Sequence, residues 1–503
     1  MVLPIRRLGL ALKSDYTLGN VLERVAQHNG DRRLVEEAEG GLTLTYAQAA
    51  KRVRRWSGGI AKRAQPGERV VVATPNGYEM LLLCLAASRA GAIPVPVNPQ
   101  LTKSEFDHVV ANSDAKLVIR AAAEVDGSEP LAEEVPAEPG AVAALFYTSG
   151  TTGKPKGVEL SHKSLVGSFA RAGAVPPELT GQFEAVVGLP VAHIMGFAAL
   201  LGLACAGVPV YLLPKFNPVK VLDAIEQRRS GIFIGVPAMY RMLLEAGAED
   251  RDLSCIRAWG AGADAMPSEL AAKFKKMGAT ITLPLFGAIG EAVFFEGYGM
   301  VELGGGAAAK ISPPFLDLGL GSDAFGFPLP GYSFKVVDPD SGEELGGGKS
   351  GELLIKGPGV TSGYYGDADA TAATMAGDGW LRSGDLARMG PFGTVLFEGR
   401  AKDVIKVGGY SVYALEVEKA IEEHPDVLEA AVVPLPDDRK GEVPGAVLRL
   451  RDGATLDEAA LKAHCDERLA AYKIPQRWLA IDDLPRTGTN KVKRRDLVSR
   501  FDE

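Results

Sequence analysis

The chain of 503 residues carries a net charge of −8, with 46% hydrophobic and 23% charged residues. That length exceeds what one hydrophobic core ordinarily organises, so we expect two or more domains. The acidic balance gives nucleic-acid binding little electrostatic support, and the basic run at 491–495 is typical of a solvated face. Four widely spaced cysteines imply neither a disulfide framework nor a metal site, which favours a reducing, cytoplasmic compartment.

Residues 196–213 contain no charged side chain, so a membrane span has to be weighed against a buried element. Gly202, Gly207 and Pro209 interrupt this stretch, and its second half is typical of a β-strand. We therefore predict a buried helix, a turn and a strand here, and no integral membrane span.

In the first 120 residues, apolar strand patterns alternate with helical ones. A strand at 42–46 leads into a helix at Ala47, for which Thr45 is a suitable N-cap. Strand, helix and strand at the observed spacing indicate βαβ units. The patterns predict strands at 69–73, 92–97 and 116–120, and a helix at 79–90.

An apolar β-type run from Val142 to Tyr147 ends in a dense cluster of hydroxyls, glycines and lysines. Glycines let backbone N–H groups turn toward an anion, hydroxyls donate to phosphoryl oxygens, and lysines neutralise charge. The spacing is not that of a Walker A loop, and the alternative is a flexible Gly/Ser/Thr turn. The candidate phosphate ligands are Thr148, Ser149, Gly150, Thr151, Thr152, Gly153, Lys154 and Lys156.

Residues 148–157, Thr-Ser-Gly-Thr-Thr-Gly-Lys-Pro-Lys-Gly, resemble the phosphate loop of the adenylate-forming superfamily, which includes acyl-CoA synthetases, luciferases and peptide-synthetase adenylation domains. Further family motifs follow in order as far as residue 491. The resemblance implies an α/β fold whose N-terminal domain, 1–399, has two doubly wound α/β lobes and a small β-barrel-like lobe. A mobile α+β C-terminal lid, 400–503, would rotate about a hinge near Lys402.

Two segments of the resemblance concern the acyl pocket. Residues 190–196 resemble the family motif Pro-x-aromatic-His-x-x-Gly, which implies that His193 lies where the acyl pocket meets the thiol tunnel. Ala192 replaces the aromatic residue of that motif and leaves the gating role open. Gly262, Ala263 and Asp264 match a family segment that lines the adenine and acyl pockets.

Residues 298–302 resemble the family motif Tyr-Gly-x-Thr-Glu. The resemblance implies that Tyr298, followed by Gly299, stacks on adenine and that Glu302 holds Mg²⁺, because a carboxylate with nucleotide phosphates is a common way to hold this ion. Val301 stands where the threonine hydroxyl would touch phosphate. Just before this motif, residues 280–293 look like an insertion with no readable motif.

The C-terminal motifs imply ribose, phosphate and CoA contacts. Asp385 matches the aspartate that accepts both ribose hydroxyls, although this motif by itself is equally compatible with a turn aspartate after a glycine. Lys491 matches the lysine that bridges the attacking carboxylate and the α-phosphate, with Asn490 in place of a glycine. The segment from Gly399 to Tyr410 contributes Arg400, Lys402, Lys406, Gly408 and Gly409, and its glycine pair would border the pantetheine tunnel.

The reaction implied by the resemblance joins a small-molecule carboxylic acid to CoA through an acyl-adenylate, with ATP, Mg²⁺ and CoA as cofactors. The predicted pocket residues are apolar or small, which favours an apolar fatty acid over an aryl or cinnamate-type acid and disfavours a dicarboxylate. The catalytic candidates are Lys491, Glu302, His193 and Thr148, and the pocket candidates are Ile194, Met195, Phe197, Val236, Gly262 and Gly287.

Two further interpretations stay open. The acyl group could pass to a carrier protein or an amine instead of CoA. Ala192, Val301 and Asn490 differ from the family motifs, and these differences could instead mark an acyl- or nucleotide-binding protein whose catalytic activity is weakened. Chain length of the acid and oligomeric state, including a homodimer, are not determined by the sequence.

Overall fold

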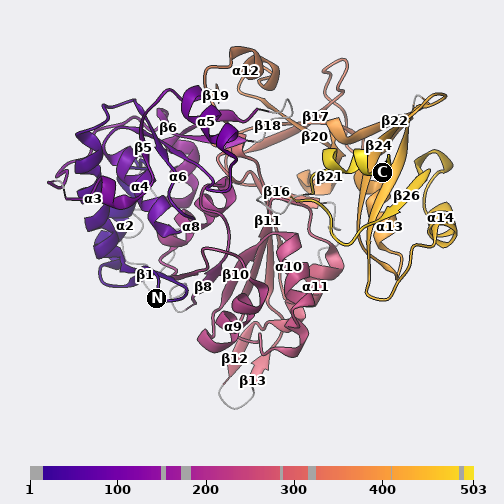
Figure 1. Ribbon diagram of the computed structural model, residues 1–503, viewed down its shortest axis with the longest axis horizontal. Coiled ribbons are helices and arrows are strands. Elements are labelled where there is room, and N and C mark those ends of the chain that lie inside the picture. The colour runs from indigo at the N-terminus through magenta and orange to yellow at the C-terminus, as the bar shows by residue number, and fades with distance from the viewer. Residues whose placement is uncertain are drawn as a thin grey trace. The chain divides into compact units, whose positions relative to one another are not determined.

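The computed structural model describes residues 15–127, 129–148, 154–170, 183–283, 287–314, 324–408, 410–486 and 492–502. Contacts divide the chain into two compact units (Figure 1). The first unit runs to Ser333 and includes 356–381, and the second contains 334–355 and the chain from Arg382 onward.

The first unit is built around a mixed sheet in which strands far apart in sequence pair side by side. Its five central strands, between residues 185 and 298, pair in parallel, as expected of short apolar strands buried on both faces. The order across this unit is β16 (Ala324–Pro328), β15 (Ala308–Ser312), β14 (Val293–Tyr298), β11 (Ala258–Gly262), β10 (Ile232–Gly235), β8 (Ala185–Val187), β9 (Val210–Leu212), β1 (Arg33–Glu37) and β2 (Thr43–Thr45).

Two smaller sheets complete the first unit. Strands β4 (Ile93–Pro96), β3 (Arg69–Val72) and β5 (Ala115–Ile119) pair in parallel, which confirms the predicted βαβ units. Strands β19 (Gly363–Tyr364), β7 (Lys156–Ser161) and β6 (Val142–Thr148) pair in antiparallel fashion. The helices of this unit are α2 (Val21–Asn29), α3 (Tyr46–Ala61), α4 (Tyr78–Arg89), α5 (Lys103–Asn112), α6 (His162–Ala170), α8 (Ile194–Ala206), α9 (Pro218–Arg228), α10 (Pro237–Glu245), α11 (Ser268–Met277) and α12 (Ala368–Thr374).

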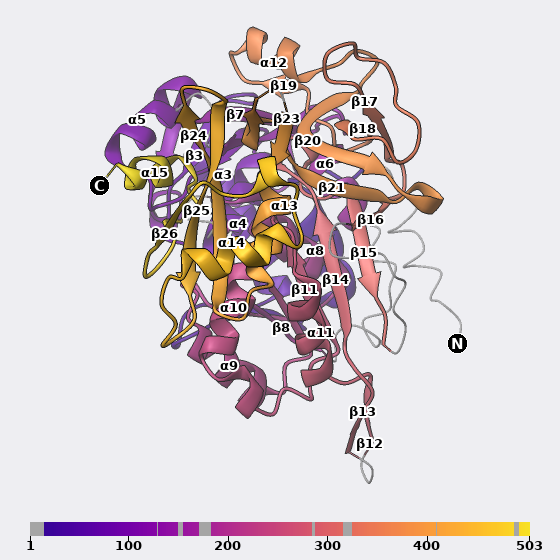
Figure 2. The same ribbon diagram turned by 90° about the vertical axis from the view of Figure 1, so that its right-hand side faces the viewer.

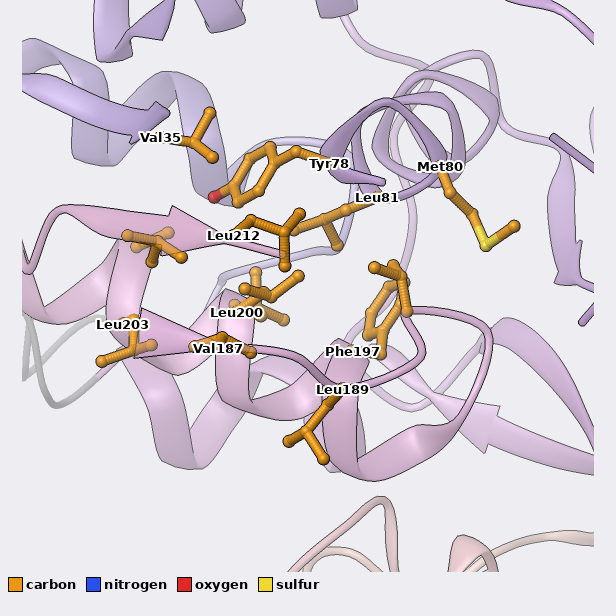
Figure 3. Packing of buried hydrophobic residues seen from close by; sticks show 14 of the residues in the cluster. Val35, Tyr78, Met80, Leu81, Val187, Leu189, Phe197, Leu200, Leu203 and Leu212 are labelled. Carbon is orange, nitrogen blue, oxygen red and sulfur yellow. The ribbon is translucent and has the colours of Figure 1, made fainter. Parts of the chain in front are cut away.

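The core of the first unit lies between the sheet and the helices α4 and α8. Val35, Val187 and Leu212 project from adjacent strands toward Tyr78 and Leu200 of these helices (Figure 3). The predicted buried helix, turn and strand is confirmed, because α8 ends at a left-handed glycine and is followed directly by β9. In the described part of the chain, no helix is long and apolar enough to cross a membrane.

The predicted N-cap is also confirmed. Thr45 accepts a hydrogen bond from the Gln48 backbone N–H, and the Gln48 side chain accepts one from the Thr45 N–H, which together form a capping box.

One strand and one hairpin were absent from the predictions. The strand is β1, which is not among the strands predicted for the first 120 residues. The insertion at 280–293 forms a hairpin of β12 (Ile281–Leu283) and β13 (Gly287–Ile289), which extends away from the sheet in both ribbon views (Figures 1 and 2).

The second unit contains a C-terminal sheet with apolar side chains on both faces. Ala430 and Val432 of β24 (Val427–Asp437) pack with α13 (Ala414–Glu422) and α14 (Glu458–Asp466). The alternate residues Ala431 and Val433 pack with Leu497 of α15 (Arg495–Val498). These elements are labelled in Figure 2. The strands and helices of this unit are β17 (Ser333–Val337), β18 (Gly351–Lys356), β20 (Leu381–Met389), β21 (Val395–Arg400), β22 (Val404–Val407), β23 (Tyr410–Tyr413), α13 (Ala414–Glu422), β24 (Val427–Asp437), β25 (Gly441–Leu450), α14 (Glu458–Asp466), β26 (Arg477–Ala480) and α15 (Arg495–Val498).

A glycine in α3 provides a test of the packing. A Cβ at Gly59 would lie 2.0 Å from the Val125 carbonyl oxygen, so Gly59→Ala should destabilise the protein by about 1–3 kcal/mol through overpacking, although alanine is the better helix former. At Gly167 in α6 the nearest atom would be Lys163 Cγ at 3.7 Å, so Gly167→Ala should be neutral or stabilising. Thermal unfolding measures the melting temperatures of both variants. Equal melting temperatures for Gly59→Ala and Gly167→Ala would contradict the close contact between Gly59 and Val125.

Candidate functional site

The ends of the predicted phosphate loop are fixed by an antiparallel strand pair. Thr148, the last residue of β6, is the register partner of Lys156, the first residue of β7. Gly157 directly faces Tyr147, whose ring carbon lies 3.0 Å from where a Cβ would be, which explains a glycine at this position. The predicted ligands Ser149, Gly150, Thr151, Thr152 and Gly153 lie outside the described residues.

The two lysines of the loop have different surroundings. Lys154 is exposed, whereas Lys156 is half-buried. The Lys156 ammonium lies 3.3 Å from Asp367 Oδ2 and 5.5 Å from the centre of the Tyr364 ring. The Ala370 N–H and the Lys156 ammonium lower the pKa of Asp367, so this carboxylate stays charged beside the lysine.

Glu302 lies in the short helix η4 (Val301–Leu303) and is only 7% exposed. The Tyr364 hydroxyl donates a hydrogen bond of 2.9 Å to Glu302 Oε1, and the Thr361 N–H donates one of 2.8 Å to the Glu302 carbonyl oxygen. Burial and the nearby Glu302 charge raise the pKa of Tyr364, which keeps its hydroxyl protonated as a donor.

The predicted adenine segments follow neighbouring parallel strands. Gly262 at the end of β11 is the register partner of Gly297 in β14, so the segments after them leave the same edge of the sheet. In open α/β sheets, ligands bind at the carboxyl ends of strands. Ala263 has a left-handed φ of 68°, a strained conformation of the kind found at binding sites, and Asp264 is exposed.

Tyr298, the predicted adenine partner, already has one ring neighbour. Its ring stacks on Phe325 with centroids 3.6 Å apart, so Phe325 supports one face of the tyrosine. The next residue, Gly299, occupies a position at which no side chain fits, because a Cβ there would lie 1.5 Å from the Gly305 carbonyl oxygen.

The predicted acyl residues are only partly brought together. His193 caps α8, its Nδ1 accepting from the Met195 N–H, and the Met195 side chain lies 3.4 Å from where a Cβ of Gly262 would be. Phe197 is fully buried in edge contact with Phe146, which makes it a core residue. Gly287 lies on the exposed β12–β13 hairpin, so the structure does not support it as a pocket residue.

In the second unit, Arg400 Nε lies 2.7 Å from Oδ1 of Asp385, whose side chain is 1% exposed. The two residues are register partners in β20 and β21. Lys402 is exposed in η6 (Ala401–Asp403), and the ammonium of Lys406 donates to Ser411. Gly408 has a φ of 56°, which favours glycine, while Gly409 and Lys491 lie outside the described residues.

A magnesium ion fits the chemistry of this region. The Tyr364 hydroxyl donates to one oxygen of the Glu302 carboxylate, and a carboxylate is the kind of ligand that Mg²⁺ takes together with nucleotide phosphates. Within the described ranges, no group of three or more His, Cys, Asp or Glu side chains could hold a metal alone.

Sequence reasoning missed three residues that the structure places here: Tyr364, Asp367 and Phe325. Tyr364 and Asp367 belong to Gly363-Tyr364-Tyr365-Gly366-Asp367, whose aromatic pair between glycines was the available signal. No local pattern links these residues to Lys156 or Glu302.

Comparisons with known proteins identify the family of the chain. The family description "AMP-binding enzyme" matches residues 22–365, and "AMP-binding enzyme C-terminal domain" matches 416–491. A feruloyl-CoA synthase from Amycolatopsis sp. is 33% identical, covering 92% of this chain and 95% of the relative. A long-chain-fatty-acid–CoA ligase from Bacillus subtilis is 34% identical, covering 71% of this chain and 61% of the relative.

The ATP-bound crystal structure of MatB from Rhodopseudomonas palustris has the same fold. It matches with a TM-score of 0.85 and 29% identity, covering 97% of this chain and 99% of that chain. Both the sequence match over more than half of the chain and the shared fold confirm the resemblance inferred from the motifs. The chain therefore belongs to the AMP-binding enzyme family of the adenylate-forming superfamily.

Proposed function

We propose that the protein is an acid–CoA ligase that activates a carboxylic acid as its acyl-adenylate and transfers the acyl group to CoA. One observation carries this proposal: the phosphate-loop lysine Lys156 and the carboxylate Glu302 both contact one tyrosine, Tyr364, the lysine at its ring and the carboxylate at its hydroxyl. A cation-binding carboxylate next to a phosphate-binding lysine is the arrangement that a metal–nucleotide complex requires.

In the first half-reaction, a carboxylate oxygen of the acid attacks the α-phosphorus of ATP, and the bond to pyrophosphate breaks. Lys491 would neutralise the charge that develops between the attacking oxygen and the α-phosphate. Lys156 and the phosphate-loop donors would hold the leaving pyrophosphate. Mg²⁺, when held by Glu302, would supply further charge neutralisation.

In the second half-reaction, the CoA sulfur attacks the acyl carbon as a thiolate, and AMP leaves. We assign residues 1–399 to the nucleotide- and acid-binding domain and 400–503 to a lid that turns about Lys402 between the two steps. Asp385 and Arg400 would orient the ribose, and Gly408 and Gly409 would line the path of the thiol.

The acid that we favour has an apolar body. The Met195 side chain lies beside Gly262. The pocket candidates Ile194 and Val236 are both buried apolar residues, so the acid-binding pocket that we predict has apolar walls. An aliphatic fatty acid is our first candidate. An aryl acid is the second, because the feruloyl-CoA synthase covers more of this chain than the fatty-acid ligase does.

Pyrophosphate release across a panel of aliphatic, aryl and dicarboxylic acids, with and without CoA, tests the function. Release that requires an apolar acid and rises with CoA is the expected result. Release that ignores CoA would favour a carrier protein or an amine as acceptor. Absence of release with every acid would contradict the proposed reaction and favour a binding protein.

The catalytic lysine can be tested against a neighbouring one. Lys491→Ala should slow acyl-adenylate formation by about 100-fold or more, because a charge-stabilising donor is lost from the transition state. Thioester formation from preformed acyl-adenylate should change little, because Lys491 acts only in the first half-reaction. Lys493→Ala, at an exposed position, is the matched control. Equal losses in both variants would contradict the assigned role.

The departure at Val301 makes a gain-of-function prediction. Val301→Thr would restore a hydroxyl that donates to a charged phosphate, an interaction worth about 1.5–3 kcal/mol. The rate of adenylation should therefore rise by about tenfold or more. Single-turnover formation of acyl-adenylate measures this rate, and an unchanged value would remove the reason for calling the site weakened.

A further inference from the structure

We propose that Tyr364 is a positioning residue that holds the Glu302 carboxylate in the orientation needed for Mg²⁺, an inference that rests on the proposed function. The Tyr364 hydroxyl donates to Glu302 Oε1 over 2.9 Å, and Glu302 is 7% exposed. Because one carboxylate oxygen is held in this way, rotation of the carboxylate is restricted and the other oxygen has a defined direction.

Tyr364 is itself fixed by a segment that we call the strap, residues 361–367. The Thr361 hydroxyl donates to the Glu159 carbonyl oxygen over 2.6 Å, and the Thr361 N–H donates to the Glu302 carbonyl oxygen. Tyr364 then pairs with Val158 in β7, the strand that follows the phosphate loop. The strap therefore connects the backbone of the Glu302 turn to that of the phosphate-loop strand.

The same tyrosine also contacts the cationic side of the site. The Lys156 ammonium lies 5.5 Å from the Tyr364 ring centre, and Asp367, the last residue of the strap, is 3.3 Å from that ammonium. The face of the ring is turned to the phosphate-binding lysine, and its hydroxyl to the metal-binding carboxylate. Loss of the hydroxyl alone should therefore disturb the carboxylate and leave the lysine contact intact.

The strap supplies a matched pair of substitutions. Tyr364→Phe removes the hydroxyl on Glu302 and keeps the ring beside Lys156. Tyr365→Phe removes the neighbouring hydroxyl from a ring that lies 5.2 Å from the Arg69 guanidinium, outside the Glu302 contacts. Both changes keep size and shape, so both variants should fold.

The experiment measures Mg²⁺ dependence in two ways. The first readout is the rise in melting temperature with a non-hydrolysable ATP analogue as Mg²⁺ is titrated, because a ligand that binds only the folded state stabilises it. The second is acid-dependent exchange of pyrophosphate into ATP over the same Mg²⁺ range. In Tyr364→Phe, the Mg²⁺ concentration for half-maximal effect should rise about tenfold or more in both, as expected when a partner of a metal ligand is lost.

Tyr365→Phe should match the wild type in both readouts. Unchanged Mg²⁺ midpoints in Tyr364→Phe would overturn the inference, and so would equal shifts in the two variants. If the wild type binds the Mg²⁺–analogue complex but exchanges no pyrophosphate with any acid, the proposed function fails. The positioning role is then decided by the melting-temperature midpoints alone.

Discussion

The site depends on holding the Glu302 carboxylate where little water reaches it, since its residue is 7% exposed. Buried polar groups need hydrogen-bond partners, because an unsatisfied one costs free energy. Glu302 is accommodated because the Tyr364 hydroxyl donates to one of its oxygens and the Thr361 N–H fixes its backbone. Both partners come from one strap some 60 residues further along the chain, where β19 pairs with β7. Pairing of these strands is therefore a precondition for the carboxylate.

Close backbone approach shapes the segments at the ends of β11 and β14. Gly262 and Gly297 are register partners on these adjacent parallel strands, and the Met195 side chain lies beside Gly262. A side chain at Gly299 would overlap the Gly305 carbonyl oxygen, so the chain turns here only with glycine. Small residues at these strand ends therefore allow neighbouring backbone and side chains to approach closely.

Elements with strong local patterns could be predicted from sequence, and those stabilised by distant partners could not. The βαβ units, the Thr45 cap and the buried helix before β9 all follow from local periodicity and capping chemistry. β1 was missed because it carries charged residues, of which Glu36 pairs with Arg228, 192 positions away. The β12–β13 hairpin was missed because its exposed strands have no buried face to produce an alternating pattern.

The family could be recognised from sequence alone, because its motifs place particular residue types at short spacing, as in 148–157 and 298–302. The side chains that contact these motifs became known only from the folded chain. Tyr364 contacts Glu302, and Asp367 contacts Lys156, because the strand pairing of β19 with β7 brings these distant segments together. Phe325 of β16 stacks on Tyr298 of β14, although β15 separates these strands in the sheet order. Such partners lie on different elements, so no local pattern of residues could have identified them.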